Sequence, residues 1–98
     1  MSTSPTKHWG KYRGQVVANL DPEMRARLQV TVPSVLGDEI LWAEASVPAS
    51  DVVAGEIFIG PPIGSSVWVE FEGGSPHYPI WVGCRITSPL QTHRPGHT

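Results

Sequence analysis

The sequence has little cysteine, little charge and no long apolar run, and each shortage excludes a class of protein. Cys84 is the single cysteine, so it cannot pair within the chain or supply a zinc site by itself. Charged residues make up 16 % of the 98 residues and hydrophobic residues 40 %, which excludes a disordered, solvated segment. The longest uncharged stretch, from Ile57 to the residue before Glu70, is broken by glycines, prolines and serines, which excludes a membrane-spanning helix there. Because residues 1–11 have no apolar run typical of a secretory signal, we expect the chain to be made and kept in the cytoplasm.

Positive charge is absent from most of the chain. Residues 1–27 hold five Lys or Arg against two acids, a balance of +3, whereas residues 28–84 hold seven acids and no Lys or Arg. Arg85 and Arg94 restore two positive charges, which gives the net charge of −2. A nucleic-acid site needs a continuous basic stripe to neutralise phosphates, so this distribution disfavours nucleic acid as a partner.

Two segments in the first third of the chain predict an antiparallel hairpin. Residues 12–19 are rich in strand-forming side chains and end at Asp21-Pro22, a turn signal. Residues 27–32 alternate strictly, which predicts a strand with Leu28, Val30 and Val32 facing inward. Pro33 ends that strand, and residues 33–39 are expected to form a loop.

Three further strands are expected, with a long connection over residues 49–62 that holds a short helix or turn. Residues 40–47 show weak alternation, and residues 67–72 place Val67, Val69 and Phe71 inward. The segment 80–86 is expected to point four side chains into the core, namely Ile80, Val82, Cys84 and Ile86.

Five short strands without a long helical window favour an all-β fold. A flat sheet of such strands would expose two edges and an apolar face, whereas a small five-stranded Greek-key barrel of the oligonucleotide/oligosaccharide-binding (OB) type covers both. Ten glycines and ten prolines supply the turns. We therefore expect a flexible N-terminal arm over residues 1–11, an OB-fold barrel over residues 12–86 and a flexible C-terminal tail over residues 87–98.

No group of residues has the pattern of a catalytic or metal site. The sequence contains no G-x-S-x-G, and Cys84 is expected to be a buried structural thiol. Glu70 and Glu72 share one side of a strand but are expected to be solvated. His93 and His97 are separated by Arg-Pro-Gly, which forbids a helix that would bring them together. We expect no enzymatic activity, no metal and no cofactor.

Three of the four tryptophans lie in predicted strands and indicate a protein interface. The alternation places Trp68 and Trp81 on the outer face of the barrel, opposite the predicted core. Outward aromatic side chains are typical of a partner surface, and Glu70 and Glu72 beside Trp68 would repel a phosphate backbone.

Six short motifs in order resemble the OB-fold domain at the base of spike proteins in contractile injection machines. The first two are residues 14–23, with the Asp-Pro turn, and Arg27-Leu-Gln-Val-Thr-Val-Pro33. The next two are Trp42-Ala43 and Phe58-Ile-Gly-Pro-Pro-Ile-Gly64. The last two are residues 67–76 and Pro79-Ile-Trp-Val-Gly83, so the resemblance covers about residues 13–86. Phage baseplate assembly proteins V and the valine-glycine-repeat proteins G of type VI secretion belong to this family.

The resemblance implies a structural role without chemistry. It implies a homotrimer that docks to a tail hub and carries or adapts a separate spike tip or needle protein, in a virion baseplate or another contractile particle. About a dozen residues follow Ile86, where relatives continue into a needle, so we do not expect membrane piercing or stable membrane insertion. The expected interface residues are Trp42, Phe58, Pro61, Pro62, Trp68, Glu70 and Trp81. The alternative is a single-stranded nucleic-acid-binding OB-fold protein.

Overall fold

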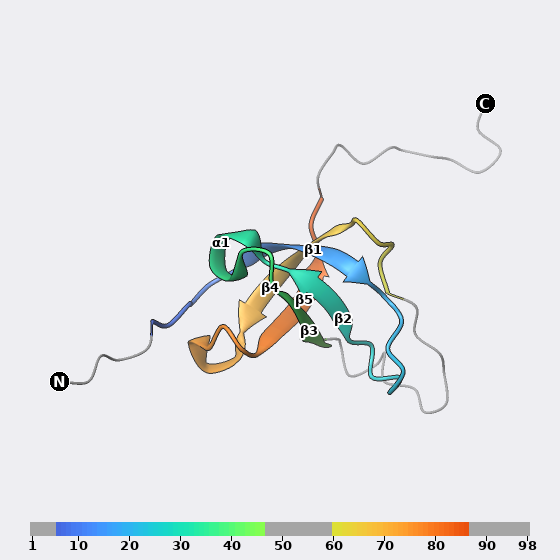
Figure 1. The fold of residues 1–98 in the computed structure, drawn as a ribbon, viewed down its shortest axis with the longest axis horizontal. Coiled ribbons are helices and arrows are strands. Elements are labelled where there is room, and N and C mark those ends of the chain that lie inside the picture. Colours follow the sequence, from blue (N-terminus) through green and yellow to red (C-terminus); the bar gives the residue numbers. More distant parts are fainter. Residues whose placement is uncertain (1–5, 47–59, 87–98) are drawn as a thin grey trace.

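The computed structural model describes residues 6–46 and 60–86, which contain the five strands expected from the sequence (Figure 1). The strands are β1 (Tyr12–Ala18), β2 (Leu28–Thr31), β3 (Ile40–Ala45), β4 (Ser66–Phe71) and β5 (Pro79–Cys84). A one-turn helix, α1 (Pro33–Leu36), and a 3-10 turn, η2 (Glu72–Gly74), connect them. Most of the expected connection over residues 49–62, including Phe58, lies outside the described residues.

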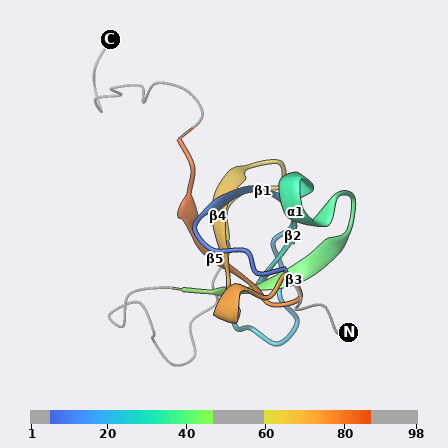
Figure 2. The same cartoon turned by 90° about the vertical axis from the view of Figure 1, so that its left-hand side faces the viewer.

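The strands close into a barrel in the order β1-β2-β3-β5-β4, and β1 pairs with β4 to complete the ring (Figure 2). Four of the five pairings are antiparallel, and β3 with β5 is parallel. The expected all-β, OB-type barrel is therefore confirmed. No helix in the described ranges is long and apolar enough to span a membrane.

The core consists of the alternating side chains of β2 and β4 together with single residues from the other strands. Its buried members are Val16, Leu28, Val30, Val32, Ala43, Val67, Val69, Phe71 and Trp81. The alternation predicted for residues 27–32 and 67–72 is confirmed, because a closed barrel excludes water from one face of every strand. Gly14 in β1 is also buried, and a Cβ there would lie 2.8 Å from Cγ2 of Val69. The close approach of β1 to β4 thus requires glycine at this position.

The prediction of a loop over residues 33–39 is wrong at its start, where α1 forms. Pro33 suits the first turn of a helix because its missing N–H would have no partner there. The backbone N–H of Leu36 donates to the carbonyl oxygen of Val32, and Val35 and Leu36 pack against the core. Helix α1 therefore covers an end of the barrel.

The prediction that Trp81 points outward is wrong. Trp81 is 6 % exposed and belongs to the core, whereas Ile80 and Val82 are only half-buried. All three residues of Ile80-Trp81-Val82 are apolar, so alternation within this segment cannot show which side chains face the core. Pairing with β4 selects it, since Trp81 lies opposite the inward-facing Val69. The indole also finds a hydrogen-bond acceptor, which a buried tryptophan needs.

Two further residues of this segment, both expected inside, are exposed. Cys84, the last residue of β5, is exposed, and Ile86, beyond the strand, is 66 % exposed. An irregularity between Trp68 and Val69 sets Trp68 opposite Gly83 and Val69 opposite Trp81, so β5 has one extra residue, Val82, at this point. A single alternating face through residues 80–86 is therefore impossible.

Residues ahead of β1 contact one end of the barrel. The backbone N–H of His8 donates to the carbonyl oxygen of Gly74 at 2.8 Å, and the Tyr12 hydroxyl donates to the carbonyl oxygen of Trp9 at 3.0 Å. The His8 ring lies against Tyr12 and Phe71. Flexibility of the arm over residues 1–11 stays a prediction, but its described part has fixed partners.

Candidate functional site

The loop between β1 and β2 is organised by one carboxylate. Oδ1 of Asp21 accepts the backbone N–H of Glu23, and Oδ2 accepts the backbone N–H groups of Arg25 and Arg27. Arg27 also donates Nε and Nη2 to the two carboxylate oxygens, each at 2.9 Å. Asp21 is 3 % exposed at its side chain, so the five bonds replace the water that burial removes.

These bonds change the ionisation of both partners and fix an unusual backbone. The Arg27 side chain, followed by the three backbone N–H groups, holds the pKa of the Asp21 carboxyl well below its usual range, although burial opposes this. Asp21 in turn raises the pKa of Arg27. Met24 and Ala26 have φ of 56° and 62°, a left-handed conformation that costs non-glycine residues roughly 1 kcal/mol or more. The Asp21 bonds hold this loop in one shape.

Two tryptophans connect the loop to the barrel. The guanidinium carbon of Arg27 lies 4.5 Å from the centre of the Trp42 ring, a cation–π contact on the outer face of β2 and β3. Trp81 donates its Nε1–H from the core to the carbonyl oxygen of Ala26 at 3.0 Å. Trp42 is half-buried, so part of it stays accessible beside the loop.

A small pocket lies between this loop and the β4–β5 connection, on the face where OB folds bind oligonucleotides or oligosaccharides. Its volume is about 100 Å³, and its lining includes Arg27, Trp42, Glu44, Glu72, His77 and Tyr78. Arg27 is already bonded to Asp21, and its guanidinium covers Trp42. The two glutamates therefore dominate the available charge. This pocket does not suit a phosphate backbone.

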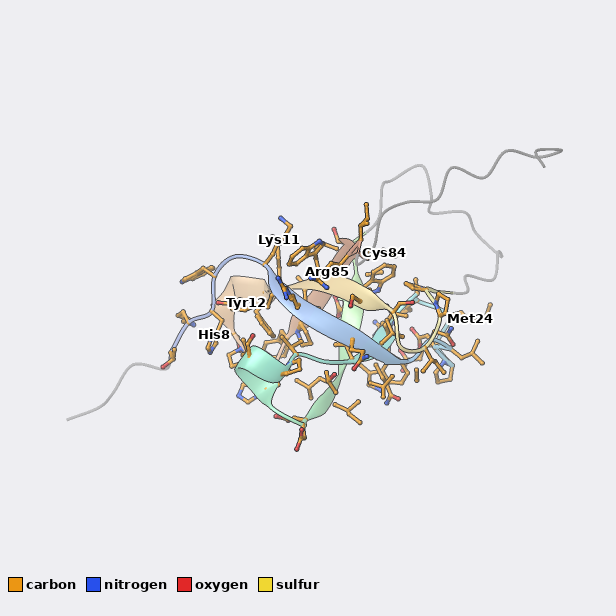
Figure 3. All side chains as sticks on the ribbon, turned by 90° about the horizontal axis from the view of Figure 1, so that it is seen from above. His8, Lys11, Tyr12, Met24, Cys84 and Arg85 are labelled. Atoms are coloured by element: carbon orange, nitrogen blue, oxygen red, sulfur yellow. The ribbon has the colours of Figure 1, made fainter. Side chains whose placement is uncertain are left out.

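A second surface, which we call the Trp68 face, lies across β1, β4 and the end of β5. It consists of Lys11, Arg13, Trp68, Glu70 and Arg85. Arg13 stands opposite Trp68 on the neighbouring strand, and the guanidinium carbon of Arg85 lies 5.7 Å from the centre of the Trp68 ring. Lys11 pairs with Glu70 at 3.3 Å. Figure 3 shows Lys11 and Arg85 on this side of the barrel.

The Trp68 face is aromatic and carries a surplus of positive charge. Three cations against one carboxylate leave a charge of +2. A shallow groove of about 580 Å³ runs from Trp68 over Lys11 and Arg13 to Pro33 and Ser34 of α1. The sequence pattern indicated Trp68 and Glu70 but not the three cations. Lys11 and Arg13 lie 55 or more positions from Trp68, and Arg85 lies in a different predicted strand, 17 positions away. Only the pairing of β1 with β4 brings Arg13 beside Trp68.

The remaining expected interface residues lie elsewhere. Pro61 is half-buried and its carbonyl oxygen accepts Nδ2 of Asn19, while Pro62 is exposed. Ile63, which follows, is 65 % exposed. Thus Trp68 and Glu70 share one face, Trp42 lies on another, and the Pro61-Pro62 segment runs along β1. Phe58, His93 and His97 lie outside the described residues.

In the described ranges, no group of three or more His, Cys, Asp or Glu side chains is placed to hold a metal ion. Glu70 is occupied by Lys11, and Glu72 begins the 3-10 turn after β4. The geometry thus offers surfaces and a fixed loop as its candidate functional features.

Comparison with known proteins identifies the family of the chain. A search of curated proteins finds no match to the chain. Residues 12–85, from the first residue of β1 to the residue after β5, match a family described as the type VI secretion system/phage-baseplate injector OB domain. The chain therefore belongs to the family of phage-baseplate and type VI secretion injector OB domains, a family of structural components of baseplates and injection machines.

Proposed function

We propose that the chain is a homotrimeric module that docks to the hub of a contractile tail or injection machine and carries or adapts a spike tip. The observation that supports this most directly is the family match, which covers the whole described barrel. In this role the barrel acts as a spacer with partner surfaces, and it needs no reacting group.

The exposed side chains support a domain with several neighbours. Large apolar residues are exposed at both ends and on the sides of the barrel, including Trp9, Leu20, Met24, Ile63 and Tyr78. Figure 3 shows Met24 at the end of the barrel away from His8. These exposed side chains are candidate contacts with neighbours in an assembly.

We propose that the interface includes Trp42, Pro61, Pro62, Trp68 and Glu70, with Phe58 as a further candidate outside the described residues. Trp81 acts differently, since it fixes the backbone at Ala26 from inside the barrel. The loop that presents Leu20 and Met24 is thereby held in one conformation, which lowers the entropy lost on docking.

The test is the mass of the purified chain in solution. Sedimentation velocity over a range of concentrations is expected to give a species of three times the 10.6 kDa chain mass. A monomer at every concentration would contradict the trimer. Removing residues 90–98, which lie outside the described residues, tests the tip: we expect trimers that no longer retain the tip partner, and full retention would refute a docking role for the tail.

A second candidate, a single-stranded nucleic-acid-binding protein, rests on the Trp68 face. Trp68 between two arginines resembles the combination of stacking platform and cations that such proteins use. Against it stand Glu70 on the same face and the acidic pocket on the side where OB folds usually bind strands.

A further inference from the structure

The Trp68 face carries two arginines that form no ion pair within the described residues. Arg13 is exposed on β1, and Arg85 contacts the Trp68 ring instead of a carboxylate. The four ion pairs in the described part of the chain use Lys11, Arg25 and Arg27, with Arg27 in two of them. Two positive charges beside a half-buried indole are thus available to a partner.

Two exposed acidic residues precede an exposed apolar residue at the start of β3. Asp38 and Glu39 are exposed in the turn after α1, and Ile40, the next residue, is 49 % exposed. Neither acid takes part in an ion pair in the described ranges. We call Asp38, Glu39 and Ile40 the Ile40 edge.

The two surfaces are complementary and lie on different sides of the molecule. One offers an aromatic ring between arginines, and the other an aliphatic side chain beside two carboxylates. Trp68 lies in β4 and Ile40 begins β3, and these strands are not neighbours in the barrel, because β5 separates them on one side and β1 and β2 separate them on the other. Both surfaces can therefore be occupied at once by two neighbouring molecules.

We infer that the Trp68 face of one copy binds the Ile40 edge of the next copy, and that this head-to-tail contact builds the homotrimer. Joining two different patches is a heterologous contact, which closes into a ring when the rotation between copies fits. This inference rests on the proposed function and adds the interface to it.

The same contact brings residues of opposite charge together. Within residues 6–46 and 60–86 neither Arg13 nor Arg85 has a carboxylate partner, and a second copy supplies one to each. Trp68 and Ile40 would then lose water together at the centre, while the charged pairs form the rim and select the orientation.

The test is the salt-dependent association of the full chain and four variants, measured by sedimentation velocity. The double variant Arg13→Glu/Arg85→Glu reverses the charge of the Trp68 face. The double variant Asp38→Lys/Glu39→Lys reverses the charge of the Ile40 edge. The quadruple variant combines both reversals. Arg25→Glu is the matched control, because Arg25 is an exposed cation in the loop after β1 and belongs to neither surface. Circular dichroism checks that each variant is folded.

Each double variant is expected to weaken association by about tenfold or more, and the quadruple variant to restore it, while Arg25→Glu leaves it unchanged. Wild-type association should weaken with added salt. A trimer that tolerates both double reversals would overturn the interface and leave the proposed trimer standing. A wild-type chain that stays monomeric would instead refute the trimer itself.

Binding of a labelled oligothymidine tests the remaining alternative, which is a nucleic-acid site on the Trp68 face. If Arg13→Glu/Arg85→Glu abolished micromolar, salt-sensitive binding of this strand but left the trimer intact, the face would be a nucleic-acid site and the inferred contact would be wrong.

Discussion

Arg27 binds Asp21 through two hydrogen bonds of 2.9 Å, one to each carboxylate oxygen, while the remaining lone pairs of the carboxylate accept three backbone N–H groups. This pair joins residues six positions apart and lets Met24 and Ala26, which lie between them, keep left-handed backbone angles without glycine. Most of the side-chain hydrogen bonds that hold this loop therefore converge on one carboxylate.

Replacing Asp21 by Ala should lower the free energy of unfolding by about 2 to 4 kcal/mol, because several donors lose their acceptor at once. Urea denaturation measures this. Glu72→Ala is the control, since Glu72 is exposed, belongs to no described ion pair and lies on neither proposed trimer surface, and it should change the value by less than about 0.5 kcal/mol. Equal effects of the two substitutions would show that Asp21 does not organise the loop.

The pH dependence of stability should carry the signature of Asp21. The pKa of this carboxyl is lowered by folding, so the unfolded chain binds more protons in acid and stability falls as pH drops below the unfolded value of about 3.9. The contribution should be complete at neutral pH. In Asp21→Asn the fall between about pH 5 and pH 2 should be shallower than in the wild type. Identical slopes in urea titrations would contradict the lowered pKa.

Truncation of Trp81 should mainly lower stability, whereas truncation of Trp68 should mainly weaken association. Trp81→Ala removes a core side chain and the hydrogen bond to Ala26, and should cost about 3 to 5 kcal/mol of stability. Trp68→Ser should leave the fold intact, with a cost of about 1 kcal/mol or less in the isolated chain, and weaken association by about 1 to 3 kcal/mol per interface. Thermal unfolding and sedimentation separate the two effects. Unfolding of Trp68→Ser at ordinary temperature would mean that Trp68 also supports the core.

Gly14→Ala should destabilise the barrel by about 1 to 3 kcal/mol, because the added methyl carbon would lie 2.8 Å from Val69 and 3.2 Å from the carbonyl oxygen of Thr31. Gln15→Ala, at the next and exposed position of β1, is the control and should be nearly neutral. If Gly14→Ala and the wild type have the same midpoint of urea unfolding, β1 and β4 must be able to move apart.

The sequence predicted the parts of the fold in which one face is chosen by a clear alternation. Leu28, Val30 and Val32 are separated by polar residues, so burial of one face settles their orientation. Around Trp81 the residues on both faces of the strand are apolar. Which face is buried is decided only by the pairing of Trp81 with Val69, a contact that the local sequence pattern does not contain. The candidate site shows the same limit. Trp68 could be found from its own strand, whereas Arg13 and Arg85 reach it only through pairing across the barrel.

The hydrogen bond from Trp81 to Ala26 joins residues 55 positions apart and involves the last strand of the barrel. A nascent chain therefore cannot complete the loop after β1 until β5 has emerged from the ribosome and entered its place. Leu20 and Met24 would reach their final positions only after the whole domain has folded. In the proposed docking role, a truncated or half-folded copy would offer the hub a misshapen loop, and incorporation into a particle would favour complete subunits.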